Sequence, residues 1–469
     1  MNPRRRRFLK AAAAGGLAYA LGRTADTVYA QSTGVGGFSD YKALVCLFLF
    51  GGNDSWNMVV PTSTAEYNAY STSRGGEAGV GSGLAIPRAS LLPINPLNSN
   101  LNGATFGLHP SMAGVQSLFE AQRAAILANV GPLIRPTTKA QYQTPGWQLP
   151  PQLFSHNDQQ DQWHSLRGQA LLRTGWGGRV ADLLAAGAAN QQIPLNVSLA
   201  GQTYFQAGEQ ATPYVMGATG ATAFAGMGAT GSGPARRTAF QAVVAAARDS
   251  TANTLYERAQ ANVQLRATQY ADLVNGALTG PSVRNFTALP DSGATLTALQ
   301  TQLRTVAKMI SVRSNLSMSR QVFFVSTGGF DTHDDLVADQ PGLLGGVSTA
   351  IKSFYDALTE IGLEQNVTLF THSDFGRTLT SNGDGSDHAW GGVQLVVGGA
   401  VRGQTIYGTY PSLAIGSPQD VGAGRFIPAV SVDQYAATLA KWFGVPDGQL
   451  GLIAPNLANF ADRDLGFLA

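Results

Sequence analysis

Short, nearly continuous apolar runs recur along the chain, and longer amphipathic segments separate them. The apolar runs predict strands at 43–50, 124–130, 193–199, 321–327, 366–371 and 393–398. Strands that are apolar on both faces are typical of a parallel sheet covered by helices on both sides. The pattern therefore predicts an α/β fold with a doubly wound, mostly parallel sheet sandwiched by helices.

Helical periodicity occupies the intervals, and it predicts helices at 111–122, 177–187, 237–276, 292–317, 344–362 and 432–443. Such alternation of strands and helices is the pattern of a doubly wound sheet. Two stretches depart from it. Residues 206–236 are rich in Gly, Ala and Thr and predict a loop, either a lid or a plain flexible insertion. Residues 237–317 predict a helical insertion.

The first thirty residues have the pattern of an export signal. An Arg-Arg-x-Phe-Leu-Lys motif begins at Arg5, and a small-residue cleavage site ends at Ala30. An ordinary secretory signal or an N-terminal anchor are the alternatives, but the apolar run 11–21 is too short to span a bilayer of about 30 Å. We expect residues 1–30 to be a twin-arginine signal recognised by the twin-arginine translocase. Residues 31–469 would then be a periplasmic or secreted α/β domain without a transmembrane segment.

Removing the signal changes the charge of the chain. Residues 1–30 hold six of the 31 Lys and Arg residues and one of the 29 Asp and Glu residues, so the remainder is near −3. This balance gives no support to a nucleic-acid partner. The only cysteine, Cys46, lies inside an apolar strand and cannot form an intramolecular disulfide, so we expect it to be buried.

Acidic and imidazole side chains follow several of the predicted strands. Asp331 and His333 come directly after strand 321–327, and residues two apart in extended chain point to one face. Asp54 follows two glycines after the first strand, Asp374 follows strand 366–371, and His388 follows a Gly-rich loop. Because the carboxyl ends of parallel strands meet at one edge of a sheet, these five side chains are candidate metal ligands.

Each of these residues has a plainer interpretation, since an Asp after glycines often caps a turn and a His beside an Asp is often a structural pair. Several such pairs at converging strand ends favour a metal. Carboxylates with imidazoles suit zinc or manganese, whereas an oxygen-rich site suits calcium or magnesium, so the sequence predicts a divalent ion of unknown identity.

Two further residues are candidates for catalysis. Ser155 lies where a helix would begin, so its hydroxyl is either an N-cap or a nucleophile near a metal. Arg377 follows Asp374-Phe375-Gly376, where it could clamp an anion with two hydrogen bonds or pair with an acid.

These motifs in this order resemble the bacterial family known as domain of unknown function 1501, from about residue 40 to the C-terminus. The matching motifs are Gly-Gly-Asn-Asp, Leu-His-Pro-Ser, Ser-His, Gly-Gly-Phe-Asp-Thr-His, Asp-Phe-Gly-Arg-Thr and Asp-His. The family is in turn similar to the alkaline-phosphatase-like superfamily of phosphatases and sulfatases. That resemblance implies one metal site at Asp54, Ser155 and Asp374, and a second at Asp331, His333 and His388.

The sequence and the resemblance together lead to two hypotheses. The first is an exported, metal-dependent hydrolase of a phosphate or sulfate ester, with a small or polymeric anionic substrate. The second is an exported binding or structural protein that keeps the fold, and one metal at most, without turnover.

Overall fold

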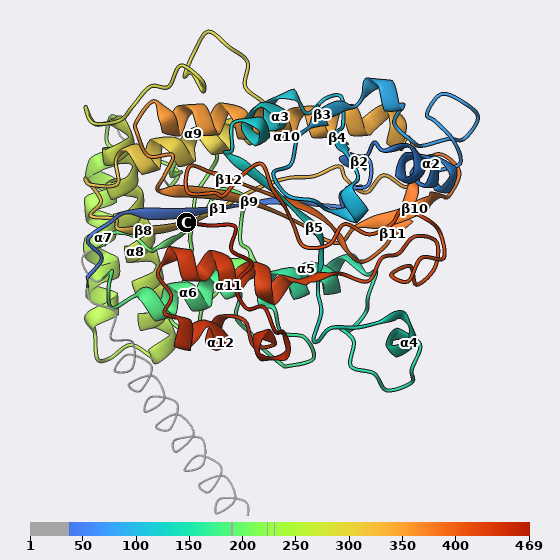
Figure 1. Ribbon diagram of the computed structural model, residues 1–469. Helices are drawn as coiled ribbons and strands as arrows, with labels where there is room; N and C mark the ends of the chain where they lie inside the picture. Colours follow the sequence, from blue (N-terminus) through green and yellow to red (C-terminus); the bar gives the residue numbers. More distant parts are fainter. Residues whose placement is uncertain (1–36, 189–190, 223, 229) are drawn as a thin grey trace, which may run out of the picture.

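A twisted central sheet lies between two layers of helices in the computed structural model (Figure 1). The structure describes residues 37–188, 191–222, 224–228 and 230–469, so the predicted twin-arginine signal lies outside the described residues. Within the described part of the chain, no helix is both long enough and apolar enough to cross a membrane.

The central sheet is mixed and mostly parallel. Its spatial order is β13 (Ile406–Tyr407), β5 (Ala124–Gly131), β12 (Gly392–Gly398), β9 (Val367–Ser373), β1 (Lys42–Leu49), β8 (Arg320–Thr327), β6 (Asn196–Ser198) and β7 (Tyr214–Val215), while β14 (Val430–Ser431) also pairs with β5. Only β12 is antiparallel to its neighbours, β9 and β5. The α/β class and the mostly parallel sheet are therefore confirmed.

Helices cover both faces of this sheet (Figure 1). One layer holds α3 (Ala113–Glu120), α9 (Ala298–Ser311) and α10 (Leu336–Thr359), and the other holds α5 (His156–Ser165), α6 (Trp176–Leu184), α11 (Val432–Phe443) and α12 (Leu450–Ile453). Strand β1 is apolar throughout because both of its faces are buried. Val45 packs in the α9/α10 core, whereas Cys46 packs in the α6/α11 core. The buried thiol of Cys46 agrees with the prediction.

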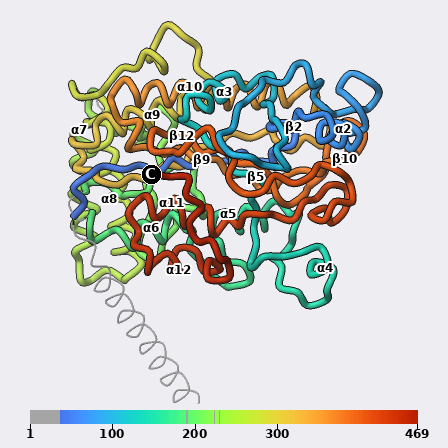
Figure 2. The backbone as a smooth tube through the Cα atoms, in the orientation of Figure 1, coloured from blue at the N-terminus to red at the C-terminus, as the bar shows by residue number. Residues whose placement is uncertain are grey.

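Residues far apart in the sequence become neighbours in the centre of the sheet. Strand β1, drawn in blue, pairs with β9 and β8, which follow it by more than two hundred residues (Figure 2). Their parallel pairing brings the carboxyl ends of all three strands to the same edge. This edge carries the candidate site.

The predicted insertion 237–317 divides into separate elements. Helices α7 (Gly233–Asp249) and α8 (Leu255–Thr279) pack against each other beyond the sheet edge, and Thr254 starts α8 with a capping box that includes Glu257. Helix α9, by contrast, packs on β8 and α10 in the main core. The predicted loop 206–236 contributes β7 to the sheet edge.

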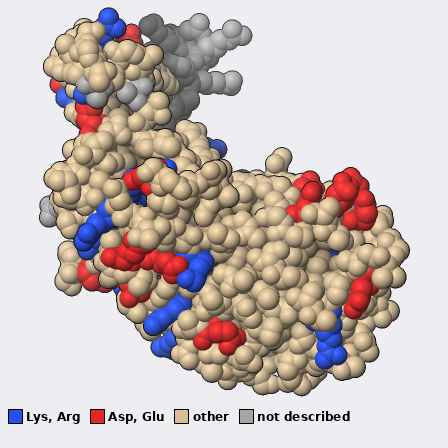
Figure 3. Space-filling model, turned by 90° about the horizontal axis from the view of Figure 1, so that it is seen from above, with Lys and Arg blue, Asp and Glu red and all other residues tan. Residues whose placement is uncertain are grey.

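Smaller elements complete the fold. They are the three-stranded sheet of β2 (Val59–Pro61), β4 (Phe106–Leu108) and β3 (Leu92–Ile94), the hairpin of β10 (Arg377–Ser381) and β11 (Ser386–His388), and the helices α2 (Thr64–Ser73) and α4 (Lys139–Tyr142). On the α3/α9/α10 side of the molecule, basic and acidic side chains are scattered among a majority of uncharged ones (Figure 3).

Candidate metal centre

Two glycines at the end of β1 allow three strand ends to approach closely. Gly51 and Gly52 have φ of +116° and +85°, a region that only glycine enters readily. A Cβ on Gly51 would collide with the backbone of Asp331, and a Cβ on Gly52 would collide with the ring of Phe375. The segments that follow β8 and β9 can therefore pack directly against the end of β1.

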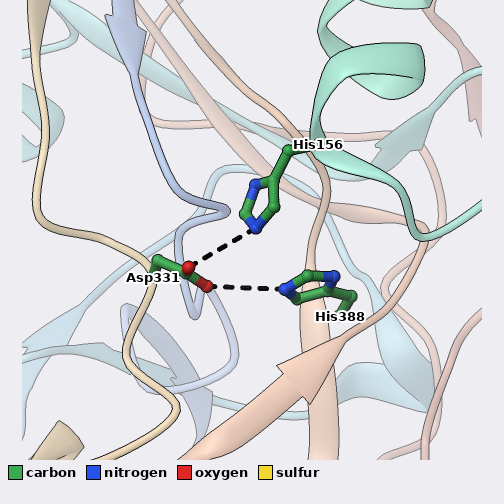
Figure 4. Close-up of side chains that lie close together, drawn as sticks. All are labelled: His156, Asp331 and His388. Carbon is green, nitrogen blue, oxygen red and sulfur yellow. Dashed lines mark ion pairs between the residues drawn. The ribbon is translucent and has the colours of Figure 1, made fainter.

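Three side chains from different elements converge at this edge (Figure 4). His156 comes from the start of α5, Asp331 from the loop after β8, and His388 from the end of β11. The Asp331 carboxylate lies 3.5 Å from Nε2 of His156 and 3.4 Å from Nε2 of His388. One ligand atom from each residue lies within 4.8 Å of the others, which is close enough for a shared cation.

A third imidazole, that of His333, lies at the edge of this group. Its Nε2 is 2.8 Å from Nε2 of His388 and 3.2 Å from the Asp331 carboxylate. The structure thus brings together three of the five predicted ligands, Asp331, His333 and His388, and adds His156 to them.

The other nitrogen of each ring faces an oxygen. Nδ1 of His156 is 2.7 Å from the Asp374 carboxylate, and Nδ1 of His333 is 3.2 Å from that of Asp387. Nδ1 of His388 is 2.7 Å from the carbonyl of Phe154, a residue held at φ +75°. Oxygen acceptors favour a proton on Nδ1, and a neutral imidazole with that proton has its free lone pair on Nε2.

This arrangement fits a cation. The lone pairs of His333 and His388 would face each other across 2.8 Å, and they would repel unless a proton or a metal ion lay beside them. Metal-binding histidines commonly donate their second N–H to a carboxylate or a carbonyl in just this way. The donor set of imidazoles and one carboxylate suits zinc, manganese or iron better than calcium or magnesium.

The charges of the two central ligands also suit metal binding. Burial lowers the pKa of His388, and the nearby cationic groups lower it further against the opposing effect of the Phe154 carbonyl. Burial alone would raise the pKa of Asp331, but the hydrogen bond and the charge of Arg377 outweigh it, so the pKa is lowered. A neutral imidazole and an ionised carboxylate are the forms that bind metal.

Asp374 orients His156 from behind. Its buried carboxylate accepts hydrogen bonds from Nδ1 of His156, from the Gln160 side chain at 2.9 Å and from the Gly51 amide at 3.2 Å. The predicted ligand Asp374 therefore lies behind a ligand, where it fixes the ring orientation. The ring of Phe375 supports the same histidine, with ring centroids 4.8 Å apart.

Arg377 holds Asp331. The guanidinium is fully buried and donates to the carbonyls of Gly51, Gly52 and Ser386 and to the Asp331 carboxylate. Of the two interpretations that the sequence left open, the contacts match pairing with an acid. With every nitrogen already donating, Arg377 is a positioning residue for Asp331.

Asp54 belongs to a separate buried ion pair. Both of its oxygens accept from the Arg74 guanidinium, and neither side chain is exposed. Its Oδ2 also accepts from Ser386 at 3.0 Å. The predicted ligand Asp54 thus has its charge balanced by Arg74, outside the three-residue group.

Ser155 is the residue before helix α5, as expected, but its hydroxyl makes no N-cap hydrogen bond to the helix backbone. It donates to the carboxylate of Asp158 at 2.8 Å instead. Ser155 lies between Phe154 and His156 in the chain, and both of these neighbours take part in the cluster.

His156 is the one residue of the cluster that the sequence argument left out of the ligand set. It belongs to a helix start and not to a strand end, so the pattern of acids and histidines that follow predicted strands does not include it. The usable signal was its place beside Ser155, because a helix that begins at the carboxyl edge of a sheet presents its first residues to a ligand there.

Comparison with known proteins identifies a family. The model of the family described as "Protein of unknown function (DUF1501)" matches residues 41–450. No curated protein matches the chain. The solved structures that match it include those of Ps i-CgsB in complex with k-i-k-neocarrahexaose and of Ps i-CgsB alone, at 10% identity and over 91% of this chain and 77% of theirs. Their TM-scores are 0.35 and 0.33, which supports no conclusion about this chain.

Proposed function

The chain belongs to the DUF1501 family, and we propose that it is an exported, metal-dependent hydrolase of a phosphate or sulfate ester. The observation that carries the proposal is the convergence of Nε2 of His156, His333 and His388 on the Asp331 carboxylate, with an oxygen behind each Nδ1. With a proton on each Nδ1, the three Nε2 atoms are acceptors that a shared cation would satisfy.

His156, Asp331 and His388 would hold the ion, with His333 as a fourth ligand or as an acid–base group beside it. A bound divalent ion supplies Lewis acidity, which stabilises negative charge on a phosphoryl or sulfuryl oxygen and lowers the pKa of a coordinated hydroxyl. Asp331 stays ionised because Arg377 donates a hydrogen bond to it, and His156 stays in one orientation because Asp374 accepts a hydrogen bond from its Nδ1.

Ser155 is the candidate nucleophile. In that role its oxygen bonds to phosphorus or sulfur while the bond to the departing alkoxide breaks, Asp158, already hydrogen-bonded to the hydroxyl, takes the serine proton, and the alkoxide is protonated by solvent. Water then hydrolyses the serine ester, which releases phosphate or sulfate and returns the serine hydroxyl. Ser155→Ala separates this route from direct attack by water, since only the covalent route requires the hydroxyl.

The alternative, an exported binding or structural protein that keeps the fold and one metal, has one observation in its favour. Arg377 was the candidate anion clamp, and its nitrogens all donate within the protein. A hydrolase at this site would therefore lack Arg377 as an anion clamp, and it would depend on the metal ion alone to stabilise the negative charge of the ester.

Metal content and ester hydrolysis of the same preparation test the proposal. The protein, purified without chelator, should contain about one equivalent of zinc, manganese or iron by elemental analysis, and it should hydrolyse phenyl phosphate or phenyl sulfate. Asp331→Asn should remove both properties. Asp384→Asn, the same change at an exposed acid in the neighbouring loop, is the matched control. Full metal content in Asp331→Asn would contradict the assigned site.

Metal without hydrolysis of any phosphate or sulfate ester would favour the binding-protein alternative. The export part of the proposal is tested separately, by replacing Arg5 and Arg6 with Lys. The precursor should then stay in the cytoplasm, and unchanged export would exclude the twin-arginine route.

A further inference from the structure

A cavity of about 420 Å³ lies beside the candidate metal centre. It is open to solvent and is lined by the residue after β1, by one side of α5 and by the loop after β6, which contributes Gln202, Thr203 and Tyr204. This size falls within the ~300–1,000 Å³ of ordinary small-molecule sites.

One helix connects the cavity to the metal centre. Asn157, Gln160, Asp161 and His164 recur at intervals of three and four residues, so they share the side of α5 that faces the cavity. The helix begins with His156, one turn before Gln160, and Gln160 itself donates to Asp374 behind that histidine. A molecule in the cavity would therefore lie next to the cluster.

The lining of the cavity combines carboxamides with aromatic rings. Asn157 and Gln202 are exposed, and within the described residues neither side chain makes a hydrogen bond, so both amides are available to a ligand. Phe50, Tyr204 and Phe324 supply apolar ring surface. A carboxamide donates and accepts at once, which is the capacity needed to bind neighbouring hydroxyl groups.

His164 adds an unsatisfied group to the lining. It is buried between the rings of Phe48 and Phe324, and its Nε2 has no hydrogen-bond partner in the described protein. A buried polar atom without a partner destabilises the folded protein, and a bound hydroxyl or water would supply that partner.

The cavity lacks positive charge. Among its lining residues there is no Lys or Arg, and the one carboxylate, Asp161, is paired at 2.8 Å with Arg167 outside the lining. An anionic group would find no countercharge there. The charged end of an ester would instead lie at the metal centre, and a neutral group would occupy the cavity.

We infer that the cavity binds the sugar ring of a phosphorylated or sulfated carbohydrate whose ester group lies at the His156–Asp331–His388 cluster. The carboxamides and Thr203 would bind the ring hydroxyls, and the aromatic side chains would pack against the apolar C–H face of the ring. This inference rests on the proposed hydrolase function and names its substrate class.

The test compares esters that carry the same phosphate or sulfate group and differ in the alcohol attached to it. KM and kcat of the metal-loaded protein are measured with glucose phosphate and phenyl phosphate, and with galactose sulfate and phenyl sulfate. Gln202→Ala removes one exposed carboxamide of the cavity. Gln143→Ala removes an equally exposed carboxamide from the end of α4, and it is the matched control.

The sugar esters should have the lowest KM in this panel. Gln202→Ala should raise their KM about three- to tenfold, the worth of one or two hydrogen bonds, while kcat and the KM of the phenyl esters stay within twofold. Gln143→Ala should change none of these values. A lower KM for the phenyl esters, or an equal rise for all esters in Gln202→Ala, would overturn the inference.

Binding of neutral glucose and galactose, observed by saturation-transfer NMR, makes the two proposals separable. If the sugars bind to the unsubstituted protein and less to Gln202→Ala, but no ester is hydrolysed, the hydrolase proposal fails and the cavity assignment stands. If phenyl esters are hydrolysed and neither sugar gives a signal, the cavity assignment fails and the hydrolase proposal stands.

Discussion

Replacing Asp374 should weaken metal binding more strongly the more of its hydrogen bonds the replacement loses. The carboxylate accepts from His156 and Gln160 through one oxygen and from the Gly51 amide through the other. In Asp374→Asn, the amide oxygen can keep the first two donors, and its NH2 group then opposes the Gly51 N–H. His156 keeps its tautomer, but it loses the negative charge that makes Nε2 a strong ligand.

Asp374→Ala removes all three acceptors, so the His156 ring becomes free to rotate and to move its proton to Nε2. Loss of a partner behind a metal-binding histidine costs about 10- to 100-fold in metal affinity. We therefore expect the metal Kd to rise about tenfold in the Asn variant and about 100-fold in the Ala variant, which is ~1.4 and ~2.7 kcal/mol.

Competition with a chromophoric chelator measures these constants, and thermal melts of the metal-free proteins check that each variant is folded. Asp384→Asn serves as the control for a change of net charge. If both Asp374 variants are folded and bind the ion within twofold of the unsubstituted protein, His156 is not a ligand oriented by Asp374. The site would then have to be reassigned.

Three further substitutions probe the surroundings of the site and the core. Arg377→Met should lower the free energy of unfolding by about 3–5 kcal/mol and also weaken metal binding, because Asp331 loses the hydrogen bond from Arg377. A chemical denaturation curve that shows unchanged stability would contradict this prediction. Arg74→Met should lower the free energy of unfolding by a similar amount, because it leaves Asp54 buried and unpaired. The metal Kd of the folded fraction should not change, and a large rise in this Kd would show that Asp54 is a ligand. Burial lowers the pKa of His109 from 6.5 to about 4, so the unfolded state binds its proton first as the pH falls. The stability that this group contributes is fully present above pH 6.5, and it falls by at most ~3 kcal/mol towards pH 4. In urea titrations of the metal-free protein, His109→Gln should therefore reduce the dependence of the free energy of unfolding on pH.

The fold was predictable where burial alone determines the pattern. The predicted strand 43–50 and helix 432–443 correspond to β1 and α11 because each has a continuous or periodic apolar pattern that only one element satisfies. The direction of β12 was not predictable, since a strand buried on both faces has the same pattern whichever way it runs. The break between α7 and α8 was missed because the capping box at Thr254 interrupts helical periodicity for only a few residues.

The site was predictable in its location and its residue types, but not in its division of roles. The sequence shows that Asp331, Asp374 and Asp54 all follow strands, and nothing local distinguishes them. Their roles depend on which hydrogen-bond donor each meets: Arg377 beside Asp331, Arg74 beside Asp54, and Nδ1 of His156 beside Asp374. These partners lie between 20 and more than 200 residues away, so only the fold assigns them.

The same dependence on distant partners explains how the histidines of the candidate metal centre are oriented. Each imidazole needs an acceptor behind it, and the acceptors are of different kinds: a buried carboxylate for His156, a half-exposed one for His333 and a backbone carbonyl for His388. The carbonyl belongs to Phe154, which adopts a left-handed conformation immediately before Ser155, the residue that precedes α5. The strained residue and His156 are thus two residues apart, so the start of α5 positions two of the three candidate ligands at once. A substitution that relaxed Phe154 would release His388 while also shifting His156, which makes this short segment the part of the chain on which the geometry of the cluster most depends.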